Sequence, residues 1–343
     1  MSILTVSQVF STIAFSTNEL SGFSTILSFT IGTAMTFLIV LPFFVLCKKH
    51  GYRSIIDFSS ERLGIFSYLV AILSLSVLLG VAISTITTFE DFLSKSVFED
   101  FHSFVIISLL IIAATYGAFL GIEALGRFAN LVFVLVLISV LIILFSVIQN
   151  IELLNLGTVS VNNAKPILKT AVEGLLSNTG LLTATLVVPF VNKKHTKSFA
   201  FWNIASLIIV EIIVFCVYGV LGNFAQGKEY PYYSTATTAE FSIIKRLDFV
   251  YMCVWVFVAF IKTTYYLLLS KQTLDTILHK NAHKYSLLFC SSISLILSFI
   301  ASERPIFRGY IWSYISSGIA LILIVVILPI ILLLKGRKKY ENL

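Results

Sequence analysis

The sequence predicts an all-α polytopic membrane protein with about ten transmembrane helices. Of its 343 residues, 58% are hydrophobic and only 12% are charged, which is about half the charged fraction of a typical soluble domain. The mean hydropathy is +0.98, and the apolar runs extend over about 18–27 residues, enough to cross a hydrocarbon core of about 30 Å. A transmembrane β-barrel would instead show alternating segments of about ten residues.

The first half of the chain, about 1–150, contains five predicted spans. The segment at 5–22 is the weakest, because polar residues interrupt it. Four continuous apolar runs follow, separated by short stretches in which the charged residues gather. In order, the predicted spans are 5–22, 24–47, 64–86, 102–119 and 124–148.

The second half, about 171–335, contains five more apolar runs and leads into a basic tail at 336–343. We interpret residues 1–343 as a single membrane domain made of these two halves and the tail. The predicted spans of the second half are 172–191, 199–223, 248–270, 285–301 and 309–335.

The basic residues predict the orientation of the spans. Cytoplasmic connections of membrane proteins carry an excess of Lys and Arg. With ten spans and a cytoplasmic N-terminus, most of the 24 Lys and Arg residues fall on the cytoplasmic side, while the outer connection 87–101 carries four acidic residues. The charge distribution therefore predicts that both termini are cytoplasmic.

Two polar patches interrupt the apolar pattern, at 16–22 in the first span and at 177–180 in the sixth. Interrupted helices at matching positions of two halves mark the binding site of many transporters, and a half-helix end offers N–H groups to a carboxylate. The alternative is that small polar residues allow close helix packing. The candidate ligand-binding residues are Asn18, Glu19, Gly22, Ser177, Asn178, Thr179, Gly180 and Thr183.

Four further charges lie in or beside predicted spans. Lys262 is in the middle of the eighth span, where a lysine is either functional or extends toward the interface. Glu211, in the seventh span, is a possible structural partner for Lys262. Glu123 and Arg127 are four residues apart at the start of the fifth span, a spacing that favours a helix-surface ion pair.

Signatures of catalysis and of metal binding are missing from the sequence. It contains no HExxH, GxSxG or phosphate-binding loop. The four cysteines are dispersed, so they predict neither a metal site nor a disulfide framework. We therefore expect a protein that is not an enzyme and that uses no cofactor or metal.

Seven short motifs stand out between residues 121 and 262. They are Gly121–Arg127, Leu186–Phe190, Tyr218–Gly222, Tyr230-Pro231, Ile243–Phe249, Val254–Val256 and Phe260–Lys262. In sequence and in order they resemble the spore germination receptor B-subunit family, the endospore germination permeases. Gly121–Arg127 is similar to that family's G-x-E-x-x-x-R at span five, and Leu186–Phe190 is similar to the close of its span six.

The resemblance implies a fold and a function. The family belongs to the amino acid–polyamine–organocation superfamily, with ten spans in a LeuT-like 5+5 inverted repeat. Its members are thought to bind a small germinant, often an amino acid, in the spore inner membrane, together with a germinant receptor A subunit and a lipoprotein C subunit. The alternative interpretation is an autonomous proton-coupled amino-acid transporter.

Overall fold

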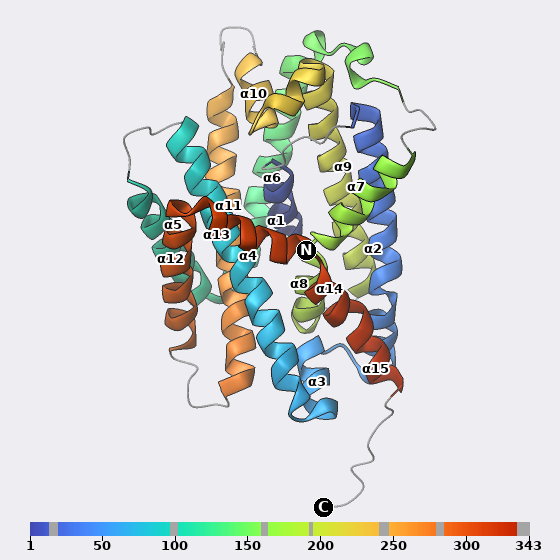
Figure 1. Cartoon of the computed structure of the whole chain (residues 1–343), viewed down its shortest axis with the longest axis vertical. Coiled ribbons are helices and arrows are strands. Elements are labelled where there is room, and N and C mark those ends of the chain that lie inside the picture. The colour runs from blue at the N-terminus through green and yellow to red at the C-terminus, as the bar shows by residue number, and fades with distance from the viewer. Residues whose placement is uncertain are drawn as a thin grey trace, which may run out of the picture. The chain divides into compact units, whose positions relative to one another are not determined.

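A computed structural model describes residues 1–13, 20–96, 102–158, 164–191, 195–239, 247–278 and 285–334. All regular elements in these ranges are helices (Figure 1). The predicted all-α polytopic class is therefore confirmed. The candidate residues Asn18 and Glu19 and the basic tail 336–343 lie outside the described residues.

Eight described helical segments are long and apolar enough to cross a membrane. The shorter apolar helix Ser103–Phe119 coincides with the fourth predicted span, and the helix Ser2–Ser11 overlaps the first predicted span over residues 5–11. Residues 14–19 of that first span lie outside the described residues, and the number of spans that cross the bilayer stays a prediction. The eight long segments are Gly22–His50, Phe66–Ser96, Gly121–Asn150, Ala164–Phe190, Thr196–Gly227, Asp248–Leu278, Ser286–Glu303 and Pro305–Leu334.

The chain forms two compact units, each drawn from several separate stretches of sequence. Neither coincides with one of the predicted halves, so the inverted repeat stays a prediction. Unit 1 comprises Met1–Met35, Glu123–Leu175 and Ala200–Lys262, and unit 2 comprises Thr36–Ile122, Leu176–Phe199 and Thr263–Leu343.

Unit 1 is built from helices whose packing relies on aromatic residues. Tyr251 and Trp255 stack with ring centroids 5.4 Å apart, and Phe10 lies 5.0 Å from Trp255. Such ring pairs add about 0.5–1.5 kcal/mol beyond their buried area. The unit contains α1 (Ser2–Ile13), α6 (Gly121–Val147), α10 (Pro231–Thr238), most of α7 (Ala164–Leu176) and α9 (His195–Leu221), and the first parts of α2 (Gly22–His50) and α11 (Asp248–Leu278). The described ranges also hold short 3₁₀ segments at Ile148–Asn150, Leu153–Leu156, Val188–Phe190 and Gly222–Gly227, the third of which belongs to unit 2.

Unit 2 centres on α12, which packs against both α4 and α5 (Figure 1). A short helix, α3, contacts α4, α8 and α15. It begins with a capping box, because Ser54 Oγ accepts from Asp57 N and the Asp57 side chain accepts from Ser54 N. The helices of the unit are α3 (Ile55–Leu63), α4 (Phe66–Ser96), α5 (Ser103–Phe119), α8 (Gly180–Val187), α12 (Ser286–Glu303), α13 (Pro305–Ser316), α14 (Ile319–Ile322) and α15 (Leu328–Leu334), with a π-helical turn at Leu323–Ile327.

Two predicted boundaries differ from the structure. Helix α4 continues to Ser96, so much of the predicted outer connection 87–101 is helical. It continues because its acidic residues find partners on neighbouring helices, as described below. The predicted span 309–335 is not continuous, since α13 ends at Ser316 and α14 begins at Ile319. Gly318 between them adopts a left-handed conformation with φ +64°, which ends the first helix.

Candidate functional site

The sixth predicted span is interrupted at Ser177–Thr179, between α7 and α8. The backbone turns tightly there, because Thr179 N donates to Ser177 O over 2.9 Å and Leu181 N donates to Asn178 O over 3.1 Å. These short-range bonds replace the helical pattern. The interruption predicted at 177–180 is therefore confirmed, and Gly180 is the first residue of α8.

Asn178 caps the start of α8. Its Oδ1 atom accepts from Gly180 N over 3.2 Å, and its backbone oxygen already accepts from Leu181 N. The first two N–H groups of α8 are therefore bonded within the chain. A ligand carboxylate could reach the Gly180 N–H only by replacing the Asn178 side chain, since one N–H makes one strong hydrogen bond.

Hydroxyl groups of α8 and α11 lie at the break. Thr179 Oγ1 and Tyr266 Oη are 2.7 Å apart, and the fully buried Thr183 donates from Oγ1 to Gly180 O over 3.1 Å. Thr263 and Thr264 are buried, and their hydroxyls have no hydrogen-bond partner among the described residues. Thr263 shares a helix face with Tyr266, because the two are three residues apart. Unit 2 therefore combines an interrupted helix with unsatisfied polar groups.

Gly318 is a part of this region that sequence reasoning missed. A Cβ atom on Gly318 would lie 2.6 Å from Leu176 Cβ and 2.9 Å from Leu176 Cα. The interruption between α13 and α14 thus contacts the last residue of α7, immediately before Ser177. The sequence signal was a Ser317-Gly318 pair inside an apolar run.

Gly22 begins α2 in unit 1, where it allows close helix packing. A Cβ atom at this position would lie 2.8 Å from Tyr218 Cβ and 3.0 Å from a methyl carbon of Leu156. A glycine therefore permits α2 and α9 to approach, as in other membrane helix pairs. For Gly22 the geometry favours the packing alternative over a direct ligand contact.

Lys262 is buried in unit 1, with 6% of its surface exposed. Its Nζ atom donates to Ser11 Oγ over 2.7 Å and lies 4.9 Å from the ring centroid of Phe10. The ammonium group therefore joins α11 to the end of α1 through a hydrogen bond and a cation–π contact. Because it is directed into the protein, Lys262 does not extend toward the interface.

Glu211 and Lys262 do not pair with each other in the described part of the chain. Glu211 Oε1 instead accepts from Thr30 Oγ1 on α2 over 2.7 Å. Each charge is hydrogen-bonded to a hydroxyl group of a different helix. The described residues therefore do not contain the structural ion pair between the two residues that was one of the alternatives.

Glu123 and Arg127 are exposed on the first turns of α6. No ion pair joins them within the described ranges, although their spacing favours one. An exposed pair gains only about 0–1 kcal/mol in water, so the two side chains have little to gain from a fixed geometry. The preceding Gly121 has φ +88° and forms the turn between α5 and α6.

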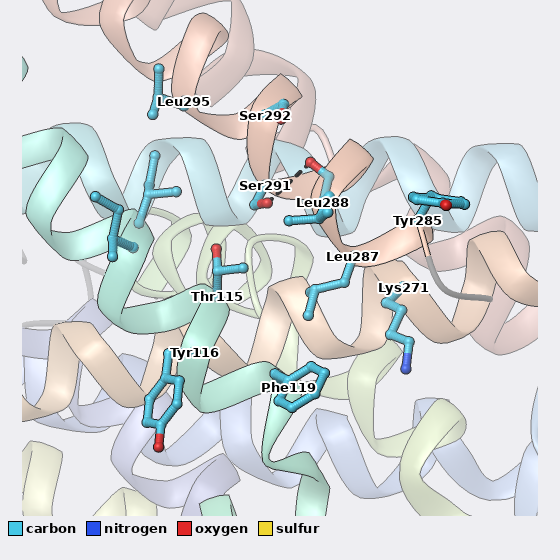
Figure 2. Close-up of a pocket in the computed structure, with 12 residues that line it drawn as sticks. Thr115, Tyr116, Phe119, Lys271, Tyr285, Leu287, Leu288, Ser291, Ser292 and Leu295 are labelled. Carbon is cyan, nitrogen blue, oxygen red and sulfur yellow. Dashed lines mark hydrogen bonds between the residues drawn. The ribbon is translucent and has the colours of Figure 1, made fainter. Parts of the chain in front are cut away.

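Unit 2 also contains a surface groove that includes none of the predicted site residues (Figure 2). It has a volume of about 680 Å³ and lies between α5, α11 and α12. Most of its lining surface is apolar, although Thr115, Ser291 and Ser292 also contribute to it, and Lys271 is its one charged residue. The groove therefore differs in chemistry from the hydroxyl-lined break.

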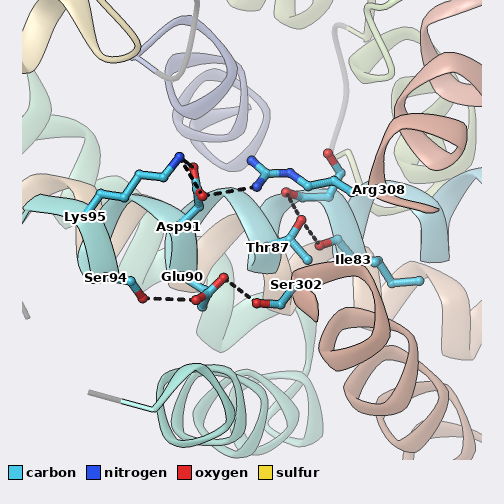
Figure 3. A network of polar contacts seen from close by, with 9 residues as sticks. Ile83, Thr87, Glu90, Asp91, Ser94, Lys95, Ser302 and Arg308 are labelled. Carbon is cyan, nitrogen blue, oxygen red and sulfur yellow. Dashed lines mark hydrogen bonds and ion pairs between the residues drawn. The ribbon is translucent and has the colours of Figure 1, made fainter. Parts of the chain in front are cut away.

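A polar network fixes α4 to α12 and α13 (Figure 3). The buried Glu90 accepts from Ser94 Oγ over 3.0 Å and from Ser302 Oγ over 2.8 Å. Its neighbour Asp91 pairs with Lys95 at 3.0 Å and with Arg308 at 3.4 Å. Both cations form ion pairs with Asp91, whereas Glu90 accepts its hydrogen bonds from two serine hydroxyl groups.

Long apolar helices, two units with buried polar contacts and a span broken at Ser177–Thr179 define an integral membrane protein of the polytopic α-helical class. The family described as "spore germination protein" matches residues 3–306. Because this match covers most of the chain, the protein belongs to that family. A search of curated proteins found no match.

Proposed function

We propose that the chain is the membrane subunit of a nutrient germinant receptor. It binds a small germinant, with an amino acid as the expected class, at the broken first and sixth helices and signals to partner subunits. Membership of the spore germination family supports the biological role. The observation that carries the site assignment is the interruption at Ser177–Thr179.

The chemistry of the break suits an amino acid. The helix end at Gly180 is a favourable place for a carboxylate, and the hydroxyls of Thr179 and Tyr266 supply further hydrogen-bonding groups. A ligand that takes the place of Asn178 Oδ1 removes the cap of α8. Binding then favours a different arrangement of α7 and α8, and this difference in affinity between two states is what a receptor needs.

The proposal includes the surroundings of the protein. We place it in the spore inner membrane or the cell membrane, with both termini cytoplasmic and ten spans in two inverted five-span halves. Its partners are an A subunit and a lipoprotein C subunit, and it carries out no enzymatic reaction and needs no cofactor. Affinity purification of the tagged protein from its native membrane in mild detergent, followed by mass spectrometry, tests the partners. Recovery of the chain alone contradicts the receptor assignment.

Substitution at the start of α8 tests the binding site. Gly180→Leu places a branched side chain in a buried position and should abolish the germinant response without removing the protein from the membrane. Gly174→Leu is the matched control, because a Cβ atom there meets nothing within 4 Å. A normal response from well-expressed Gly180→Leu protein contradicts the site assignment.

The second candidate function is proton-coupled transport of an amino acid, which the buried Lys262 favours. A lysine enclosed among helices is costly and is retained where it serves a purpose. In proteoliposomes, a transporter should take up amino acid in response to a pH gradient, and Lys262→Met should abolish the uptake. Partner-dependent signalling without net flux supports the receptor instead.

A further inference from the structure

The groove in unit 2 has a polar end and an apolar body. Figure 2 shows Lys271 and Tyr285 at one end and Leu295 at the other. Between them the lining includes Tyr116 and Leu288, whose side chains are 65% and 57% exposed. In a membrane protein such exposed apolar side chains face lipid. The groove therefore has the polarity of an amphiphile with a headgroup and a hydrocarbon chain.

The length of the groove fits one leaflet. Tyr285 and Leu295 are ten positions apart along the start of α12, which corresponds to a rise of about 15 Å. This equals half of a hydrocarbon core of about 30 Å. Because α11 has 31 residues, about 46 Å of helix, its last turns extend beyond the core. Lys271 and Tyr285 are therefore suited to the interface, where exposed tyrosines concentrate.

The charge at the polar end is positive. Lys271 makes no ion pair within the described parts of the chain, so its ammonium group is available. Asp275 lies four residues from Lys271 on α11, but it is not part of the lining and its Oδ1 atom is buried. Lys271 is therefore the charge that the described lining presents to a ligand. Such local positive charge at a membrane surface attracts anionic lipid headgroups rather than zwitterionic ones.

We propose that this groove binds an anionic phospholipid. One acyl chain lies along α5 and α12 toward Leu295, and the phosphate group lies beside Lys271 and the Tyr285 hydroxyl. The site is independent of the break at Ser177–Thr179, so it makes the lipid a structural or regulatory ligand rather than the germinant.

Lipid binding to the purified full chain, measured by native mass spectrometry, tests the headgroup. The probes are phosphatidylglycerol and phosphatidylethanolamine with identical acyl chains. Lys271→Gln should weaken phosphatidylglycerol binding about fivefold, the effect of one lysine near a charged surface, and leave phosphatidylethanolamine unchanged. Lys271→Arg should retain the binding. The exposed Lys228 provides the control Lys228→Gln, and an equal loss in that variant overturns the proposal.

Blocking the groove tests the acyl-chain site. Ser292 is exposed and lines the groove, so Ser292→Trp should remove the binding of both lipids at this site without disturbing a buried side chain. Ile296→Trp, on the same helix but outside the lining, should bind both lipids normally. A photo-crosslinking amino acid at position 292 in the native membrane should give an adduct with the mass of a phospholipid. A polypeptide adduct instead shows that a partner helix occupies the groove and overturns the proposal.

Discussion

Replacing Gly318 with alanine should destabilise the protein strongly, because the substitution carries two separate costs. The left-handed backbone at φ +64° costs an L-residue about 1–2 kcal/mol. The new Cβ atom would lie 2.6 Å from Leu176 Cβ and 2.9 Å from Leu176 Cα, and such overpacking costs about 1–3 kcal/mol. The expected loss of stability is therefore about 2–5 kcal/mol, the sum of the two costs.

Two other glycines separate these costs. Gly64 also has a positive φ, +56° with ψ −123°, and an added Cβ atom there would meet nothing within 4 Å. Gly64→Ala should therefore show a backbone cost of its own without any overpacking. Gly309 lies inside α13 with open space and no positive φ, so Gly309→Ala should be neutral or slightly stabilising. Thermal unfolding in detergent, followed by tryptophan fluorescence, should give the highest apparent Tm for Gly309→Ala, a lower one for Gly64→Ala and the lowest for Gly318→Ala. A Gly318→Ala protein as stable as the Gly309→Ala protein refutes the reasoning.

Four further substitutions test three separate contacts. Thr179→Val and Tyr266→Phe each remove the same 2.7 Å hydrogen bond, so each should lower the free energy of unfolding by about 1 kcal/mol; a double-mutant cycle checks this, and fully additive losses contradict the contact. Ser302→Ala removes one of the two donors to the buried Glu90 and should lower the free energy of unfolding in denaturant by about 1–3 kcal/mol. An unchanged unfolding midpoint would show that this hydrogen bond does not stabilise the protein. Gly22→Ala brings a Cβ within 2.8 Å of a neighbouring helix and should lower the apparent Tm; an unchanged Tm would show that the helices separate at little cost.

The sequence predicted the helices better than it predicted the polar contacts. Apolar runs report directly on spans, because the bilayer demands about 20 apolar residues per helix. The break at Ser177–Thr179 was also predictable, since Asn and Gly at membrane depth interrupt a helix and need internal partners. The continuation of α4 through Glu90 was not, because the partner Ser302 lies 212 positions away.

Isolated hydroxyl residues were the least informative signal. Ser74, Thr85 and Ser146 all donate to the backbone oxygen four residues earlier in their own helices. A hydroxyl satisfied in this way needs no cavity and no partner helix. Gly318 escaped prediction for a related reason, since a single glycine in an apolar run is compatible with either close packing or a left-handed turn.

The polar network that joins α4 to α12 and α13 has a consequence for how the chain is made. During synthesis, α4 enters the membrane before α12 and α13 have been made, so Glu90 and Asp91 are in place before their partners Ser302 and Arg308. Until then, the end of α4 carries two acidic residues that lack these partners, and such residues are costly in a bilayer. The final helices therefore complete the insertion of an early one. A chain cut short before residue 286 should remain an assembly intermediate, exposed to membrane quality control, even though it contains the first eight predicted spans.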